Sequence, residues 1–310
     1  MKKILMICFV LLGTFLGSSL FAAESPRVVV SIKPLHSLVS GVMQGVGEPA
    51  LLVKGGGSPH GYSLKPSEAR ALAQADLVVW VGPELETFLE KPLVTLAHSA
   101  QQLALAGELH DDLLEKRDGG AWESGHHDEH EGHGHEHGGD ASDLHLWLSP
   151  KLAQKIVQLV GDRLMALDPP HQLEYAANTA SLIQRLDRFD QGLARQLAPV
   201  KDVPYVVFHA AYQYFETAYG LNAVGSVTID PERKPGAKKI LEIRNKIHTL
   251  NARCVFSEPQ FESRLIATII EGTDCRTGVL DPLGADIPAG PDAYFTLLQR
   301  LADNLEAGLK

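Results

Sequence analysis

The stretch Asp76-Leu77-Val78-Val79-Trp80-Val81-Gly82 contains five consecutive apolar residues between an acid and a glycine. A strand with one solvated face alternates apolar and polar residues, whereas a strand of a parallel sheet is covered on both faces and is apolar throughout. Similar runs recur along the chain, separated by helix-like stretches, at residues 27–32, 50–53, 205–208, 223–227, 254–256 and 277–280. Alternating strands and helices predict an α/β fold with parallel sheets.

One segment in the middle of the chain is too long for an ordinary crossover helix. Asp168-Pro169-Pro170 is a helix-start signal, and only Gly192 interrupts good helix formers from there to Leu197. Apolar residues such as Leu173, Leu186 and Leu193 recur three or four positions apart. A helix of this length extends about 40 Å. We expect it to join two lobes, with an N-terminal lobe at 24–168, the linking helix at 169–198 and a C-terminal lobe at 199–310.

The N-terminus has the layout of a secretory signal peptide. Met1-Lys2-Lys3 is followed by the apolar run 4–21 and by Ala22-Ala23, so we expect residues 1–23 to be removed on export. Loss of two lysines changes the net charge from −10 to −12. Such an acidic chain does not attract nucleic acid phosphates. The 45% hydrophobic content is enough for an ordinary core.

Residues from about 110 to 143 form a segment of low complexity. The segment is rich in Gly, Asp and Glu and contains six closely spaced histidines: His126, His127, His130, His133, His135 and His137. We expect a flexible loop that binds metal weakly, because imidazoles are mostly uncharged near neutral pH. A solvated linker is the alternative. His126-His127-Asp128-Glu129-His130 formally matches a zinc-protease pattern, but that pattern needs a helix and this segment is Gly-rich.

Polar residues follow several of the predicted strands. Ligands of parallel α/β proteins bind beyond the carboxyl ends of the strands. His60 lies in the loop after strand 50–53, His209 follows strand 205–208, Glu258 follows strand 254–256 and Asp281 follows strand 277–280. His145 stands alone in an apolar stretch, two residues after Asp143. Three histidines and two acids are therefore expected at comparable edges of two lobes.

Each of these residues also has an ordinary structural interpretation. A single histidine at a strand end is commonly a hydrogen-bonded structural residue, and Asp281-Pro282 and Glu258-Pro259 are common turn starters. Together, however, His60, His145 and His209 with one oxygen ligand would make a tetrahedral zinc site. We predict these three ligands, with Asp281 or a water as the fourth and Glu258 in a supporting position. A secreted zinc hydrolase is an alternative, and it requires a general base beside the metal.

Several motifs resemble those of the metal-binding solute receptors of ABC transporters. They are Ser58-Pro59-His60-Gly61-Tyr62-Ser63-Leu64, the stretch 75–84, Asp143-Leu144-His145-Leu146-Trp147-Leu148-Ser149-Pro150, Phe208-His209-Ala210-Ala211-Tyr212, Ser257-Glu258-Pro259-Gln260-Phe261 and Leu280-Asp281-Pro282-Leu283-Gly284. The resemblance covers nearly all of the mature chain. The His-rich loop before the second His motif is typical of the zinc-specific, ZnuA-type branch.

The resemblance implies two Rossmann-like parallel-sheet lobes joined by one long rigid helix, with the metal in the cleft between them. It places metal ligands at His60, His145, His209 and Asp281. Manganese receptors and adhesins of the family tend to have a carboxylate where His209 stands, so zinc is favoured. Zinc members often have an acid directly before the first ligand, whereas this chain has Pro59. The implied protein is a monomeric periplasmic receptor, not an enzyme, that delivers Zn²⁺ to an inner-membrane permease and its ATPase.

Two cysteines remain once Cys8 leaves with the signal peptide. Cys254 and Cys275 in an exported chain most simply form one disulfide. Each lies at or near the start of a predicted strand, so neighbouring parallel strands would bring them close. The resemblance also supports a disulfide in the second lobe, although relatives can place its partner elsewhere. The alternative is a pair of buried free thiols.

Overall fold

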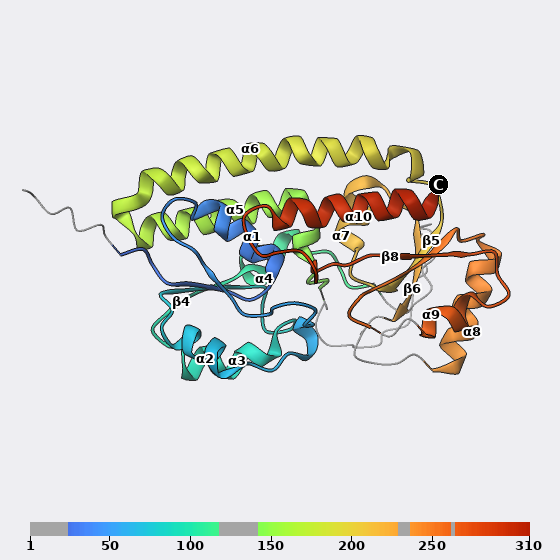
Figure 1. Cartoon of the computed structure of the whole chain (residues 1–310), viewed down its shortest axis with the longest axis horizontal. Coiled ribbons are helices and arrows are strands. Elements are labelled where there is room, and N and C mark those ends of the chain that lie inside the picture. The colour runs from blue at the N-terminus through green and yellow to red at the C-terminus, as the bar shows by residue number, and fades with distance from the viewer. Residues whose placement is uncertain (1–23, 118–141, 229–235, 262–263) are drawn as a thin grey trace, which may run out of the picture.

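The computed structural model describes residues 24–117, 142–228, 236–261 and 264–310. The predicted signal peptide and the six loop histidines lie outside the described residues. The described chain forms two four-stranded parallel sheets that lie side by side, each covered by helices on both faces (Figure 1). Among the described helices, none combines the length and apolar character needed to cross a bilayer.

The first sheet has the strand order β2-β1-β3-β4. Its strands are β1 (Val28–Val30), β2 (Ala50–Leu51), β3 (Leu77–Trp80) and β4 (Gln101–Ala104). Its helices are α1 (Lys33–Val42), α2 (Pro66–Ala73), α3 (Thr87–Thr95), α4 (Leu105–Glu108) and α5 (Pro150–Leu167), with short 3₁₀ turns at Pro59–Gly61, His110–Asp112 and Leu146–Leu148. Both faces of the central strands are buried, as the continuous apolar runs predict. Val28 and Val30 pack with α1 and α5 residues, whereas Val29 packs on the opposite face with Leu89 of α3.

The second sheet repeats this arrangement with the order β6-β5-β7-β8. Its strands are β5 (Tyr205–His209), β6 (Ala223–Thr228), β7 (Cys254–Ser257) and β8 (Arg276–Val279). Its helices are α7 (Gln213–Tyr219), α8 (Ala237–Thr249), α9 (Arg264–Ile270) and α10 (Ala293–Leu309). β5 lies inside its sheet, between β6 and β7. Its last residue, His209, therefore lies at the carboxyl edge of the sheet with a strand on each side.

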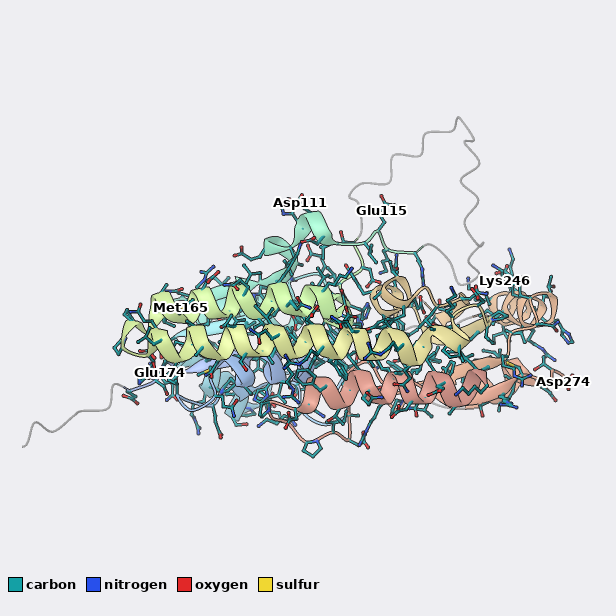
Figure 2. The ribbon with its side chains drawn as sticks, turned by 90° about the horizontal axis from the view of Figure 1, so that it is seen from above. Asp111, Glu115, Met165, Glu174, Lys246 and Asp274 are labelled. Carbon is teal, nitrogen blue, oxygen red and sulfur yellow. The ribbon has the colours of Figure 1, made fainter. Side chains whose placement is uncertain are left out.

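The predicted linking helix is present as α6 (Gln172–Leu197), with 3₁₀ turns at Pro169–His171 and Ala198–Val200. At 26 residues it extends about 39 Å. Figure 2 shows α5, α6 and α10 side by side, with Met165 and Glu174 near one end of the layer. α10 contacts α1 and α6 as well as its own strand β8, so it adds a second connection between the lobes. One continuous core cluster accordingly includes Val30 of the first sheet and Phe256 of the second.

The predicted disulfide between Cys254 and Cys275 is not formed, and both residues are free thiols. Cys254 pairs in register with Arg276, so Cys275 is offset by one residue. Successive side chains point to opposite faces of a sheet. Cys254 belongs to the core cluster beneath α10, whereas Cys275 packs against the cluster under α8 and α9. The prediction that the two cysteines lie on or beside neighbouring strands is therefore correct. Their side chains, however, point to opposite faces of the sheet.

Candidate metal centre

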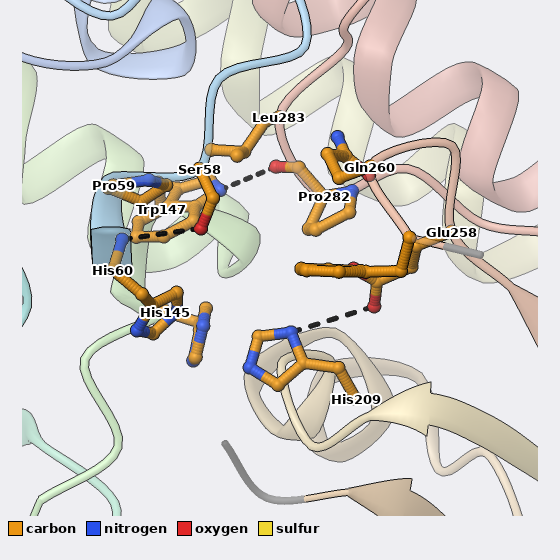
Figure 3. Close-up of a pocket in the computed structure, with 11 residues that line it drawn as sticks. Ser58, Pro59, His60, His145, Trp147, His209, Glu258, Gln260, Pro282 and Leu283 are labelled. Carbon is orange, nitrogen blue, oxygen red and sulfur yellow. Dashed lines mark hydrogen bonds and ion pairs between the residues drawn. The ribbon is translucent and has the colours of Figure 1, made fainter. Parts of the chain in front are cut away.

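Three histidines from both lobes converge at the carboxyl edges of the sheets. His60 lies in the 3₁₀ turn after β2, where Ser58 Oγ accepts a hydrogen bond from the His60 amide at 3.3 Å. His145 directly precedes the 3₁₀ turn Leu146–Leu148, and His209 is the last residue of β5. One ring nitrogen from each residue lies within 4.8 Å of the other two. Figure 3 shows the three rings turned toward one another.

The spacing of the rings suits a single small cation. The ring centroids of His145 and His209 are 4.8 Å apart, and His60 lies 5.6 and 5.3 Å from them. With zinc–nitrogen bonds of about 2.1 Å, tetrahedral geometry places neighbouring nitrogens about 3.4 Å apart. The cavity that the three rings line has a volume of about 10 Å³, the room of roughly one water centre. The rings therefore need to approach by at most about an ångström and a half to coordinate an ion.

The charge state of the imidazoles also favours metal binding. Burial, with a smaller contribution from the neighbouring His145, His209 and Lys116, lowers the pKa of His60 to about 2. Burial likewise lowers the pKa of His145, against the opposing effect of Asp143. A metal ligand must be a neutral imidazole with a free lone pair. Both groups are in that form near neutral pH.

Asp143 fixes the orientation of His145. Its Oδ1 accepts hydrogen bonds from the backbone N–H of His145 at 3.0 Å and from Nδ1–H at 2.7 Å. Nδ1 is thereby the protonated nitrogen, and Nε2 carries the lone pair. Nε2 is buried and has no hydrogen-bond partner among the described residues. A carboxylate on the far nitrogen is the usual support of a metal-bound histidine. The spacing of two residues from Asp143 to His145 was the sequence signal for this role.

His209 has a similar but looser arrangement. Its two ring nitrogens are buried without a hydrogen-bond partner in the described part of the chain. Glu258 Oε1 lies 3.6 Å from Nδ1, just beyond hydrogen-bond distance, and accepts the Tyr212 hydroxyl at 3.0 Å. Buried polar atoms without partners are rare, and a metal ion would satisfy Nε2 of both His145 and His209. Glu258 therefore stands beside the site in the supporting position that the sequence predicts.

Asp281 does not join the three imidazoles in this structure. Its Oδ1 accepts hydrogen bonds from Leu283 N and Gly284 N, both at 3.0 Å, and from Gln260 Nε2 at 2.7 Å. Its Oδ2 accepts from Ala285 N at 2.5 Å. The carboxylate thus holds the loop after β8 together, and the metal-ligand cluster among the described residues contains only His60, His145 and His209. The strand-end position predicted a polar residue near the cleft, but the following loop uses both carboxylate oxygens.

Known proteins share this organisation. The family described as "Zinc-uptake complex component A periplasmic" matches residues 28–308. The chain belongs to this ZnuA family. The high-affinity zinc uptake system protein ZnuA of Brucella abortus (strain 2308) is 45% identical, with 95% of each chain covered. The protein of the same name from Yersinia pestis is 36% identical, covering 94% of this chain and 93% of the relative.

Solved structures agree at the level of the fold. A crystal structure of ZnuA superposes with a TM-score of 0.76, at 24% sequence identity, over 93% of this chain and all of that one. Members of the ZnuA family are thus similar to this chain along nearly its whole length. This chain, with its two parallel sheets and long joining helix, therefore has the same fold as that ZnuA structure.

Proposed function

We propose that this chain is a periplasmic receptor that binds Zn²⁺ with high affinity through His60, His145 and His209 and delivers it to an ABC-type importer. The observation that carries the proposal is the set of three imidazoles, contributed by both lobes, with ligand nitrogens within 4.8 Å of one another. Zinc is the cargo rather than a resident cofactor. The names of the Brucella and Yersinia relatives, both zinc uptake proteins, support the same cargo.

The donor set favours zinc over manganese. Imidazole nitrogens suit Zn²⁺, whereas Mn²⁺ prefers carboxylate, carbonyl and water oxygens. The fourth position in our proposal is taken by a water or, after a rearrangement of the loop after β8, by Asp281. The alternative within the family, a manganese receptor or adhesin, would be better served by an acid in place of His209. The loop histidines from His126 to His137 are proposed as additional, weaker zinc ligands.

The wider assignments follow from this role. We propose that the signal peptide 1–23 directs export and that the chain divides into lobes at 24–168 and 199–310 around the linking segment 169–198. We also propose that the receptor is a monomer and binds no nucleic acid. The partners are the permease and the ATPase of the importer. We propose no catalytic activity. A hydrolase needs a free general base beside the metal, and Glu258, the one carboxylate among the described residues lining the metal cavity, accepts the Tyr212 hydroxyl.

Thermal unfolding with and without metal tests the proposal. A ligand bound only by the folded state, at a thousandfold excess over its dissociation constant, adds about 4 kcal/mol of stability. For a chain of this size the melting temperature then rises by several degrees. We expect that rise with Zn²⁺ and a much smaller one with Mn²⁺. An equal or larger rise with Mn²⁺ would contradict the zinc assignment, and metal-dependent hydrolysis of ester or peptide substrates would favour the hydrolase.

A further inference from the structure

A second and much larger cavity adjoins the metal cavity. It has a volume of about 480 Å³, and His60 and His145 line both cavities. We call this larger cavity the vestibule. Its other walls come from the loop after β3, from β4 and α4, from the segments on either side of residues 118–141, and from the residue after His209. They include Glu84, Gly107, Lys116, Asp143 and Ala210.

The two cavities differ in what they can hold. The metal cavity has room for roughly one water-sized centre, so it accepts an ion only after most of its hydration shell has been lost. A shell of six waters occupies about 180 Å³ at about 30 Å³ per water. The vestibule accommodates an ion with this shell, and the metal cavity does not. His60 and His145 stand at the boundary, where imidazole nitrogens can replace water ligands one at a time.

Buried, hydrogen-bonded residues form another wall of the metal cavity. Trp147 is 1% exposed, and its Nε1 donates to the Pro282 carbonyl of the other lobe at 2.8 Å. The Tyr294 hydroxyl donates to the Trp147 carbonyl at 2.9 Å. Figure 3 shows Trp147, Pro282 and Leu283 together along this side of the site. Of the three predicted ligands, His60 is the one that is not fully buried. His60, the most exposed of the three ligands, also lines the vestibule.

The vestibule also carries groups that favour a hydrated cation. Asp143 is 4% exposed, and its Oδ2 has no hydrogen-bond partner among the described residues. This carboxylate adds negative charge beside the vestibule. Glu84 adds an exposed carboxylate at the wall, partly offset by Lys116. An acidic wall raises the local concentration of a divalent cation and speeds its association.

We propose that the vestibule is a transit site for hydrated Zn²⁺, through which the ion reaches and leaves the three imidazoles while the two lobes stay in contact. This inference rests on the proposed function, because it concerns the route to the same metal site. It assigns the exchange of water for imidazole to the boundary formed by His60 and His145. The lobes need not separate along the Trp147–Pro282 contact.

A bulky side chain in the vestibule tests the route. Gly107 lines the vestibule, its φ is not left-handed, and a Cβ at this position would meet no atom within 4 Å among the described residues. In the full-length protein, Gly107→Phe should lower the zinc association and dissociation rate constants by the same factor, about tenfold, and leave the dissociation constant within about twofold. Stopped-flow mixing with a fluorescent zinc chelator gives both rates. Gly192→Phe is the matched control, because Gly192 on α6 has the same open surroundings far from the site.

A second variant keeps the test decisive if Gly107→Phe folds poorly. Glu84 is exposed, so Glu84→Arg should preserve the fold and slow zinc association at low salt, with the difference shrinking as salt is added. Unchanged rates in folded Gly107→Phe, or in Glu84→Arg, would overturn the transit route while leaving the receptor assignment intact. A wild-type protein that fails to bind zinc tightly would instead overturn the proposed function.

Discussion

The role of Asp281 yields a prediction that separates a loop cap from a metal ligand. In the structure its carboxylate accepts three backbone hydrogen bonds and one from Gln260. Hydrogen bonds to a charged group contribute about 1.5–3 kcal/mol each when buried, and this site is only partly buried. We therefore expect Asp281→Ala to lower the free energy of unfolding by about 2–4 kcal/mol. Asp281→Asn retains the oxygen that receives most of these bonds and should cost about 1 kcal/mol.

The assay is urea unfolding of wild type, Asp281→Ala and Asp281→Asn, each without metal and with saturating Zn²⁺. If Asp281 only holds the loop, the loss of stability is the same in both conditions, because the zinc affinity is unchanged. If it binds zinc directly, the zinc-loaded protein loses more. A 10–100-fold drop in affinity adds about 1.4–2.7 kcal/mol to the loss. That extra loss would refute the assignment of Asp281 to the loop alone.

Three further predictions concern other parts of the chain. Deletion of residues 119–139 should leave the tight zinc equivalent unchanged and remove only weaker equivalents, as measured by competitive titration; loss of tight binding would make the loop the receptor site. The metal-free protein should become less stable as pH falls below about 6.5, because the unfolded chain then protonates His60 while the folded chain, with a His60 pKa of about 2, does not. This group alone contributes about 1.3 kcal/mol between pH 7 and pH 5.5, and its slope approaches about 1.4 kcal/mol per pH unit at lower pH. His60→Asn should therefore flatten the dependence over this range in urea unfolding, and an unchanged slope would contradict it. Thiol titration of the denatured, unreduced mature protein should find two free thiols, from Cys254 and Cys275. A titration that finds no free thiol would show instead that the two cysteines form a disulfide.

The sequence predicts the α/β fold well because its signals are local and repeated. Apolar runs such as 77–81 require cover on both faces, and the segment from Gln172 to Leu197 contains no proline and only one glycine, Gly192. The elements it misses have weak local signals. β4 reads Gln-Gln-Leu-Ala and buries only Leu103 fully, because it lies at the edge of its sheet. Leu173, one of the apolar residues in the predicted helical periodicity, is 76% exposed, whereas Tyr175 and Thr179 of α6 are buried.

In the candidate site, too, some residues have clear sequence signals and others do not. His60, His145 and His209 follow from their positions after strands or alone in an apolar stretch, because topology brings such positions together. The contacts of Asp281 depend on how the loop 282–285 folds back on the carboxylate, which no spacing reveals. Lys33 is another case. It is 7% exposed and donates to the carbonyls of Gly284 and Ala285 in the other lobe, a contact between residues some 250 positions apart. The orientation of Cys254 and Cys275 likewise required the register of β7 and β8.

Competitive zinc titration of the three histidine variants tests the central claim most directly. His60→Ala, His145→Ala and His209→Ala are each titrated against a chelating dye alongside wild type, with His171→Ala as a control histidine that bonds Asp168 instead. Loss of one imidazole leaves two protein nitrogens, so each of the three variants should bind the tight zinc equivalent at least 10–100-fold more weakly. The control should match wild type. Wild-type affinity in any of the three ligand variants would contradict a site built from His60, His145 and His209.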